Sequence, residues 1–318
     1  MRYAPAHGWV RLLLVVLLLA LPGLAAAKTI HVMPGKSGTI ADALAQASAG
    51  DQVAVGCGTY DEALLTIPDG VILTGACVPG GVVIRSWGDL PLIQVAHAEI
   101  GVEISNLTLT LVDPDTPRSQ WRGDAAFLND ARVTFTGVVF RDFEAGYGGA
   151  IYCKEGSQVT FEDCVFEDNE ARAAGGAVTA AGGSGLTFER CLFVGNRSDG
   201  AGGAINVALG SSATLISCTL VGSEASLGGA VASFDASAVS IERTIVARGQ
   251  GGAVWTGDGS NPANLVCSDL YDNAGGDWTG VLDAQLGLDG NIAEAPQFCG
   301  PANPDDPWTL NASSPCRE

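Results

Sequence analysis

Basic residues are scarce in this sequence. The chain of 318 residues carries 16 Lys and Arg against 35 Asp and Glu, which gives a formal net charge of −19 at pH 7. Phosphate groups are bound by clustered cations, so this balance excludes a nucleic acid as a partner and disfavours an anionic membrane surface. Hydrophobic residues make up 47% of the chain and charged residues only 16%. This composition excludes an intrinsically disordered protein.

Metal-binding pairs of cysteine and histidine are also lacking. The chain has nine cysteines and three histidines, and no two cysteines have the Cys-x-x-Cys spacing. Because zinc-binding domains are built from such paired ligands, the sequence disfavours a structural zinc site.

Long hydrophobic runs are absent apart from one at the N-terminus. Leu12–Leu21 is flanked by Arg2 and Arg11 and is followed by three alanines at 25–27. A membrane-spanning helix needs about 20 apolar residues, so the run is too short for the alternative of a membrane anchor. The pattern predicts a signal peptide over 1–27. After its cleavage we expect a protein without membrane insertion that is secreted, either extracellular or held at the cell surface.

Glycine, in contrast, is abundant and recurs in a repeat. The tripeptide Gly-Gly-Ala begins at Gly148, Gly175, Gly202, Gly228 and Gly251, at intervals of 23 to 27 residues. Between the copies, apolar residues alternate with polar ones, as in Val159-Thr-Phe161. A period of this length indicates a solenoid or a propeller, and the alternation indicates β-strands.

The length of the repeat selects one solenoid. A propeller blade needs about 40–45 residues, and no repeat holds the helix of an ankyrin or leucine-rich unit. Two or three short strands per coil, stacked about 4.8 Å apart, predict an all-β protein folded as a right-handed parallel β-helix of about nine to eleven coils.

The two open ends of such a solenoid require caps. We expect an N-terminal cap over 28–50, the β-helix over 51–290 and a C-terminal capping tail over 291–318, in a monomeric protein. Within the first cap, apolar residues at helical spacing over 39–48 predict a short amphipathic helix that covers the first coil.

Two patterns resemble known families. Phe166-Glu-Asp-Asn169 followed by Gly175-Gly-Ala-Val178 is similar to the FxxN and GGA[ILV] repeats of the polymorphic outer-membrane proteins. The entry segment, with Gly58-Thr-Tyr60, and the exit segment, with Ser314-Pro-Cys316, resemble secreted pectate-lyase-like β-helix proteins. These resemblances imply the same fold. They do not imply one activity, because the fold serves lyases, hydrolases, esterases, epimerases and non-catalytic adhesins.

The cysteines suggest two disulfides, since export permits oxidation. Cys57 and Cys77 lie about one coil apart and are expected to pair, and a Cys299–Cys316 disulfide would close the terminal loop. Three further cysteines at 27-residue spacing are expected to fill one row of the core as small apolar side chains, with a redox or metal stack as the alternative: Cys164, Cys191 and Cys218.

One segment, 113–124, does not fit a coil and predicts a protruding loop. It places Trp121 beside Arg122 and close to Arg118. Tryptophan stacks on sugar rings and arginine binds carboxylates, so these three side chains are candidate polysaccharide-binding groups. Together with Tyr152 and Trp255, which are predicted to point outward, Trp121 would line a groove. The alternative is that Trp121 folds back and covers a strand edge.

Evidence for a cofactor or for catalysis is weaker. Asp269, Asp272 and Asp277 lie in an aspartate-rich stretch, and carboxylates suit calcium, although such stretches also occur as solvated loops. Calcium is therefore the only cofactor that the sequence suggests. The catalytic motifs of β-helix enzymes are missing, since the chain has no Gly-His-Gly and its one Asp-Asp pair, Asp305-Asp306, lies in the proline-rich tail.

We therefore expect a non-catalytic secreted or cell-surface protein that contacts polysaccharide or another surface. The alternatives are a polysaccharide lyase or hydrolase of the pectin-lyase-like fold and a structural spacer.

Overall fold

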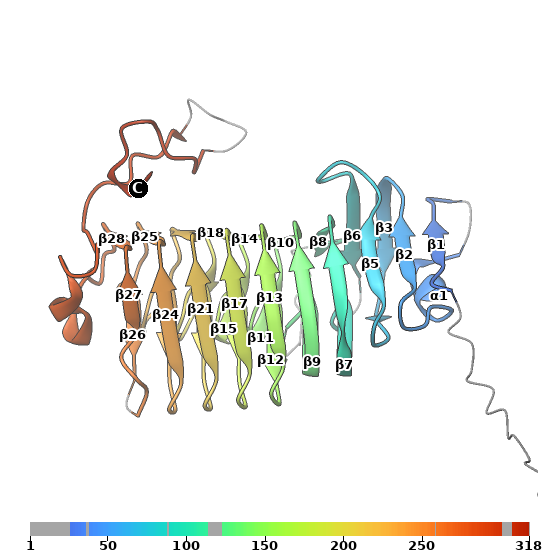
Figure 1. Ribbon diagram of the computed structural model, residues 1–318, viewed down its shortest axis with the longest axis horizontal. Helices are drawn as coiled ribbons and strands as arrows, with labels where there is room; N and C mark the ends of the chain where they lie inside the picture. The colour runs from blue at the N-terminus through green and yellow to red at the C-terminus, as the bar shows by residue number, and fades with distance from the viewer. Residues whose placement is uncertain are drawn as a thin grey trace, which may run out of the picture.

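The computed structural model describes residues 26–35, 38–87, 89–113, 123–257, 259–300 and 307–317. These residues form a right-handed parallel β-helix, which confirms the predicted fold class. Figure 1 shows the coils stacked in chain order from the N-terminal to the C-terminal end. One strand of a nine-stranded sheet belongs to each coil, so the solenoid has about nine coils.

The nine-stranded sheet runs the full length of the solenoid with every neighbouring pair parallel. Its strands are β3 (Gly58–Glu62), β6 (Val82–Ser86), β8 (Thr108–Leu111), β10 (Val139–Arg141), β14 (Val165–Glu167), β18 (Leu192–Val194), β22 (Thr219–Val221), β25 (Ile245–Ala247) and β28 (Asp269–Tyr271).

The largest sheet has 16 strands in the described residues. It divides at the long strand β9 (Ala126–Thr136), whose first half pairs with β12 and whose second half pairs with β13. One half continues through β12 (Ile151–Lys154), β16 (Val178–Ala180), β20 (Ile205–Val207), β23 (Val231–Ser233) and β26 (Val254–Thr256). The other continues through β13 (Gln158–Glu162), β17 (Gly185–Glu189), β21 (Ser212–Ile216), β24 (Ala238–Glu242) and β27 (Asn264–Val266).

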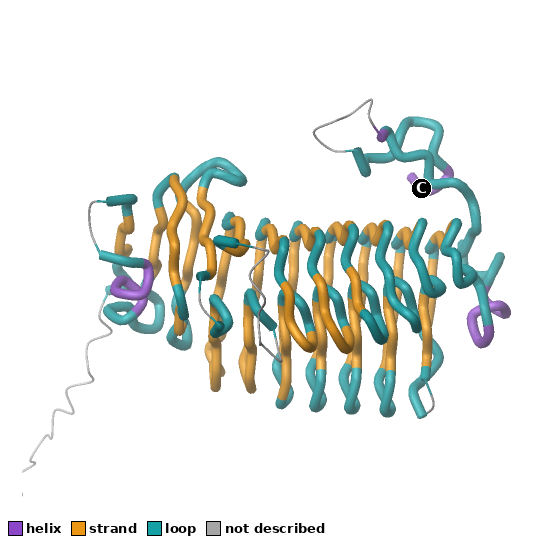
Figure 2. Tube along the Cα trace, turned by 180° about the vertical axis from the view of Figure 1, so that it is seen from behind, coloured by secondary structure: helices purple, strands orange, loops and turns teal. Residues whose placement is uncertain are grey.

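The remaining strands lie before β9 or in a small third sheet. The N-terminal strands are β1 (Thr29–Val32), β2 (Gln52–Val55), β4 (Leu65–Thr66), β5 (Ile72–Gly75) and β7 (Ile93–Ser105). The third sheet consists of β11 (Glu144–Tyr147), β15 (Glu170–Ala174) and β19 (Arg197–Ser198). Figure 2 shows how loops join the strands at the corners of each coil.

The core consists of aligned side chains from successive coils. Phe135 stacks on Phe161 at 5.3 Å between ring centroids, and Phe161 stacks on Phe188 at 4.7 Å. A second column, Phe140, Phe166 and Phe193, packs edge-on against the first. The three cysteines predicted for the core are buried free thiols, each in contact with backbone carbonyls: Cys164, Cys191 and Cys218.

Both ends are capped. Helix α1 (Ile40–Leu44) is shorter than the predicted 39–48, and Thr39 and Asp42 form a reciprocal capping box at its start. Trp278 is buried at the far end, just before the 3-10 helix η1 (Gly280–Gln285), and its indole N–H donates to the Ile292 carbonyl; a second 3-10 helix, η3 (Pro315–Arg317), ends the tail. None of the helices in the described ranges is long and apolar enough to cross a bilayer.

Candidate functional site

Exposed aromatic side chains lie beside the two ends of the predicted loop. One follows a strand of the nine-stranded sheet, and the other ends a strand of the third sheet. Trp87 comes directly after β6 and is 62% exposed, and Tyr147, at the end of β11, is 40% exposed. Such exposure of large rings is informative because a folded chain buries most of its aromatic surface. We call Trp87, Tyr147 and the ends of the loop between them the aromatic edge.

Backbone hydrogen bonds bring the loop ends to these rings. At the start of the loop, the Val112 N–H donates to the carbonyl of Ser86, the residue before Trp87, at 2.9 Å. At its end, the Gly123 N–H donates to the Tyr147 carbonyl at 2.9 Å. The predicted binding residues Arg118, Trp121 and Arg122 lie outside the described residues. The loop that carries them therefore begins beside Trp87 and ends beside Tyr147.

Gly123 fits so closely that only glycine suits this position. Its φ is +48°, and a Cβ atom there would lie 2.6 Å from the backbone nitrogen of Tyr152. Both observations require a residue without a side chain. The loop end is thus packed against the strand that carries Tyr152, which places the predicted loop and Tyr152 on one side of the molecule.

Tyr152 itself is not open to solvent, contrary to the sequence-based expectation. Its side chain is 7% exposed and stacks on Phe127 with ring planes 6° apart, while the Lys154 ammonium lies 5.6 Å from the Phe127 ring centroid. The end of the loop lies against this residue, since a Cβ atom on Gly123 would be 3.0 Å from the Tyr152 Cβ.

Trp255 lies in the same row but does not join Tyr152 in a groove. The strand register separates the two by four coils, or roughly 19 Å at 4.8 Å per coil. The intervening side chains are buried: Thr179, Asn206 and Ala232. Trp255 is half-buried and packs on Phe234 at 4.5 Å between centroids. The expected groove from Trp121 to Trp255 is therefore closed between its two ends.

The aromatic edge contains two residues that sequence reasoning missed. Trp87 follows β6 of the nine-stranded sheet, one coil before the loop, and Tyr147 ends β11 of the third sheet, one coil after the loop. The signal was present, because Tyr147 directly precedes the Gly-Gly-Ala at Gly148. Finding it required the register of the early coils, where the Gly-Gly-Ala motif is missing.

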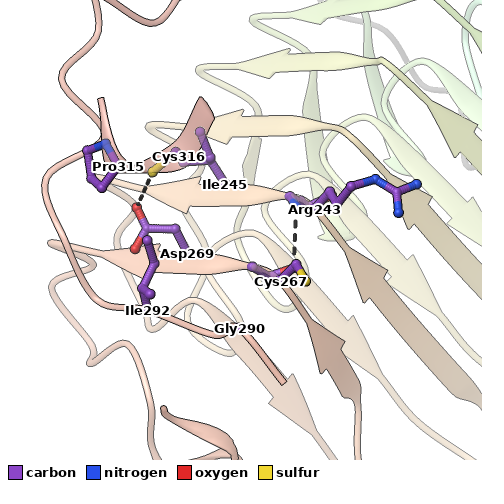
Figure 3. A pocket seen from close by; sticks show the side chains of 10 residues that line it. Arg243, Ile245, Cys267, Asp269, Gly290, Ile292, Pro315 and Cys316 are labelled. Carbon is purple, nitrogen blue, oxygen red and sulfur yellow. Dashed lines mark hydrogen bonds between the residues drawn. The ribbon is translucent and has the colours of Figure 1, made fainter. Parts of the chain in front are cut away.

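A second candidate site is a small cavity at the C-terminal end (Figure 3), with a volume of about 180 Å³. Asp269 and Cys316 face each other in it, with 3.1 Å between the thiol sulfur and Oδ2. Oδ1 of Asp269 accepts a hydrogen bond from the Glu294 N–H at 3.0 Å. The two oxygens of this carboxylate thus hold both ends of the tail.

Burial determines the protonation of this pair. Removal from water raises the pKa of Asp269 above its usual value, and the hydrogen bonds from Cys316 and Glu294 oppose that rise only in part. Burial and the nearby carboxylate raise the pKa of Cys316 to about 12. The thiol is therefore protonated at neutral pH and donates to Asp269, so it is a poor nucleophile.

Two of the three residues suggested for calcium, Asp269 and Asp277, accept backbone hydrogen bonds. The Asp277 carboxylate accepts hydrogen bonds from the N–H groups of Asp272 and Asn273 at 3.1 and 2.9 Å. Asp269 is engaged by the tail. Across the described part of the chain, no group of three or more His, Cys, Asp and Glu side chains is placed to hold a metal ion.

The structure contains one of the two expected disulfides. Cys57 and Cys77 are bonded, with their Cα atoms 5.6 Å apart. Cys299 and Cys316 are free thiols, contrary to expectation. The reason is that Cys316 turns toward Asp269, whereas Cys299 lies in a hairpin of the tail, where its N–H donates to the Thr309 carbonyl at 2.8 Å.

The chain has low sequence identity to known proteins. No curated protein sequence matches the chain. Among solved structures, it is similar to the A-module of the mannuronan C-5 epimerase AlgE4 from Azotobacter vinelandii, with 16% identity over 74% of this chain and 72% of that one and a TM-score of 0.46. The pectin methylesterase PemA from Erwinia chrysanthemi shares 15% identity over 83% and 96% of the two chains, with a TM-score of 0.41.

The family follows from the sequence model that matches the repeat region. The model described as "Right handed beta helix region" matches residues 120–291, more than half of the chain. These residues coincide with the coils that carry the Gly-Gly-Ala repeats and the phenylalanine columns. The chain therefore belongs to the right-handed β-helix family.

Proposed function

We propose that this is a non-catalytic secreted or cell-surface protein that binds polysaccharide through the aromatic edge. The observation that carries the proposal is the exposure of Trp87 and Tyr147 on the two sides of the loop. A flat ring stacks on the apolar face of a sugar, and it loses little conformational freedom when it does so. Rings on the coils before and after the loop suit a polymer whose sugars also repeat.

The loop supplies the other groups that such a site needs. Its sequence provides Trp121 as a third ring and Arg118 and Arg122 as donors to an acidic sugar. Binding groups on a loop are effective when a rigid scaffold fixes the ends of the loop. Here the backbone hydrogen bonds at Val112 and Gly123 tie both ends to adjacent coils.

The test is retention of the full chain on immobilised polysaccharides and on a glycan array. Trp87→Ala, Tyr147→Ala and Trp121→Ala should each weaken retention about threefold to tenfold, as expected for loss of one stacked ring. The melting temperature should change little, because an exposed residue contributes within about 0.5 kcal/mol.

The matched control is Leu209→Ala, which removes an exposed apolar side chain from another corner and should leave retention unchanged. A fall of several degrees in the melting temperature of Trp121→Ala would instead make Trp121 a cover for a strand edge. Absence of any glycan bound by the intact protein would reject the proposal and favour the structural spacer.

The second candidate is a polysaccharide lyase or hydrolase of the pectin-lyase-like fold. One observation favours it, namely the raised pKa of the Asp269 carboxyl in a cavity, since active sites often hold such perturbed groups. The test is incubation with uronate polymers, with and without calcium. Release of unsaturated or reducing ends that is lost in Asp269→Asn would establish the enzyme and overturn the non-catalytic proposal.

A further inference from the structure

The C-terminal tail forms a second cavity with the body of the β-helix. Figures 1 and 2 both show that the tail turns back over the last coils. The cavity has a volume of about 500 Å³ and lies between Arg248, directly after β25, and the tail residues Phe298, Gly300, Pro307 and Trp308. Its lining is mainly apolar, with one cation. It is separate from the Asp269 cavity, since the two share no lining residue.

The tail presents its two rings on a fixed hairpin. Phe298 and Leu310 form an antiparallel bridge, and the Gly300 N–H donates to the Pro307 carbonyl at 2.9 Å. Phe298 and Trp308 pack edge to face, with their centroids 5.5 Å apart and their planes at 87°. The hydrogen bonds to Asp269 hold both ends of the tail. The cavity is therefore formed before any ligand binds, which reduces the entropic cost of binding.

Arg248 differs from most arginines of this acidic chain. Six other described arginines lie within 4 Å of a carboxylate: Arg85, Arg141, Arg172, Arg190, Arg197 and Arg243. Arg248 forms no ion pair with any carboxylate in the described ranges, and its guanidinium carbon lies 5.5 Å from the centroid of the Phe298 ring. A guanidinium on a ring face keeps its N–H donors free for a planar anion.

We propose that this cavity binds an acidic sugar, with its carboxylate on Arg248 and its ring against Trp308. A guanidinium and a carboxylate match as a two-bond pair, and an indole matches the apolar face of a pyranose ring. The inference rests on the proposed function and deepens it, because it assigns the polymer to the class of uronates.

The strand register places this cavity on the same corner as Trp87. Arg248 is the residue after β25, and the register aligns it with Ser86, the residue before Trp87. Six steps of about 4.8 Å separate these positions, roughly 29 Å along the axis. An extended polysaccharide that lies along this corner would contact both the aromatic edge and the tail cavity.

The experiment compares the full chain with two arginine variants. Binding of a uronate oligomer and of a neutral oligomer of equal length is measured by titration calorimetry. Arg248→Gln should weaken binding of the uronate about tenfold and leave the neutral oligomer unchanged. Arg132→Gln is the matched control. The Arg132 side chain is exposed and has no ion pair among the described residues, and it lies on β9, far from the tail cavity. Trp308→Ala should weaken binding of both oligomers.

Three outcomes would overturn the inference. If Arg248→Gln and Arg132→Gln weaken uronate binding equally, binding depends on the overall charge of the protein and not on Arg248 in the cavity. If the intact chain binds the neutral oligomer as well as the uronate, the polymer is not selected by charge, although the aromatic edge would still bind it. If neither oligomer binds, the proposed function fails together with the inference.

Discussion

At the scale of single residues, polar groups in the turns serve the fold and not a ligand. Asn169 and Asn196 occupy the same position in successive coils and are fully buried. The Asn169 side-chain amide donates to the Phe140 carbonyl at 3.0 Å and to Asn196 Oδ1 at 2.9 Å, and Asn196 donates to the Phe166 carbonyl at 2.8 Å. These contacts satisfy the backbone of the corner, so the asparagines have no free group for a sugar.

This arrangement gives the first stability prediction. Asn196→Ala should destabilise the protein by about 1–3 kcal/mol, because it removes the side-chain donor to the Phe166 carbonyl and the acceptor of the Asn169 backbone N–H. The matched control is Ser223→Ala one coil further, since the buried Ser223 hydroxyl has no hydrogen-bond partner in the structure. Urea denaturation should show a loss for the first variant and almost none for the second. Equal losses would contradict this account.

At the scale of elements, the Gly-Gly pairs set how closely the coils approach at their corners. A Cβ atom on Gly176 would lie 2.0 Å from the Gly203 carbonyl oxygen, and one on Gly203 would lie 2.0 Å from that of Gly229. No side chain fits at such distances. In the first four motifs the second glycine is therefore required by the stacking of one coil on the next, whereas the first adopts a positive φ, as in Gly175 at +67°.

The prediction at this scale concerns one of these glycines. Gly176→Ala should lower the free energy of unfolding by more than about 3 kcal/mol, because backbone and not a flexible side chain opposes the new methyl group. Gly183→Asn is the control, since Gly183 has open space around its Cα and asparagine tolerates its positive φ. Thermal denaturation of both variants checks this. A similar melting temperature for the two would mean that the corner can relax.

The repeats explain how much the sequence could predict. Gly-Gly-Ala, the apolar alternation and the core cysteines recur with the coil, so the fold, the core and the corners followed from their spacing. The side chain of Tyr152 alternates outward as predicted, but it is buried, and the end of the non-repeating loop at Gly123 packs against it. The partner of Cys316 depends on the path of the tail. Such contacts between non-repeating segments have no signature in the sequence.

At the scale of the whole molecule, stability varies along the axis. The phenylalanine columns extend from β9 to β18 only, and the equivalent positions in later coils hold smaller side chains, among them Leu215, Leu220, Ile241 and Val246. In a solenoid each coil contacts its neighbours alone, so stability is a sum of coil and interface terms. The central coils should therefore be the most stable.

Native-state hydrogen exchange measures this gradient. Amide protons of β13, β14, β17 and β18 should exchange slowest, and those of β26, β27 and β28 should exchange faster because their local opening costs less free energy. Phe161→Leu should speed exchange in its own coil and in the coils on both sides while leaving β2 and β3 unchanged. Uniform acceleration along the whole chain would show that the solenoid unfolds as one cooperative unit.

Because every coil rises by the same amount, the number of coils sets the distance between sites along the axis. Coils from 157 to 210 repeat at 27 residues with matching register, so a whole repeat can in principle be added or removed without altering either cap. Each such change would move the tail cavity relative to the aromatic edge by a fixed increment of about 4.8 Å. Evolution could therefore change the distance between the two binding sites by changing the number of repeats. The distance would change in discrete steps, and the side chains that bind each sugar would stay the same.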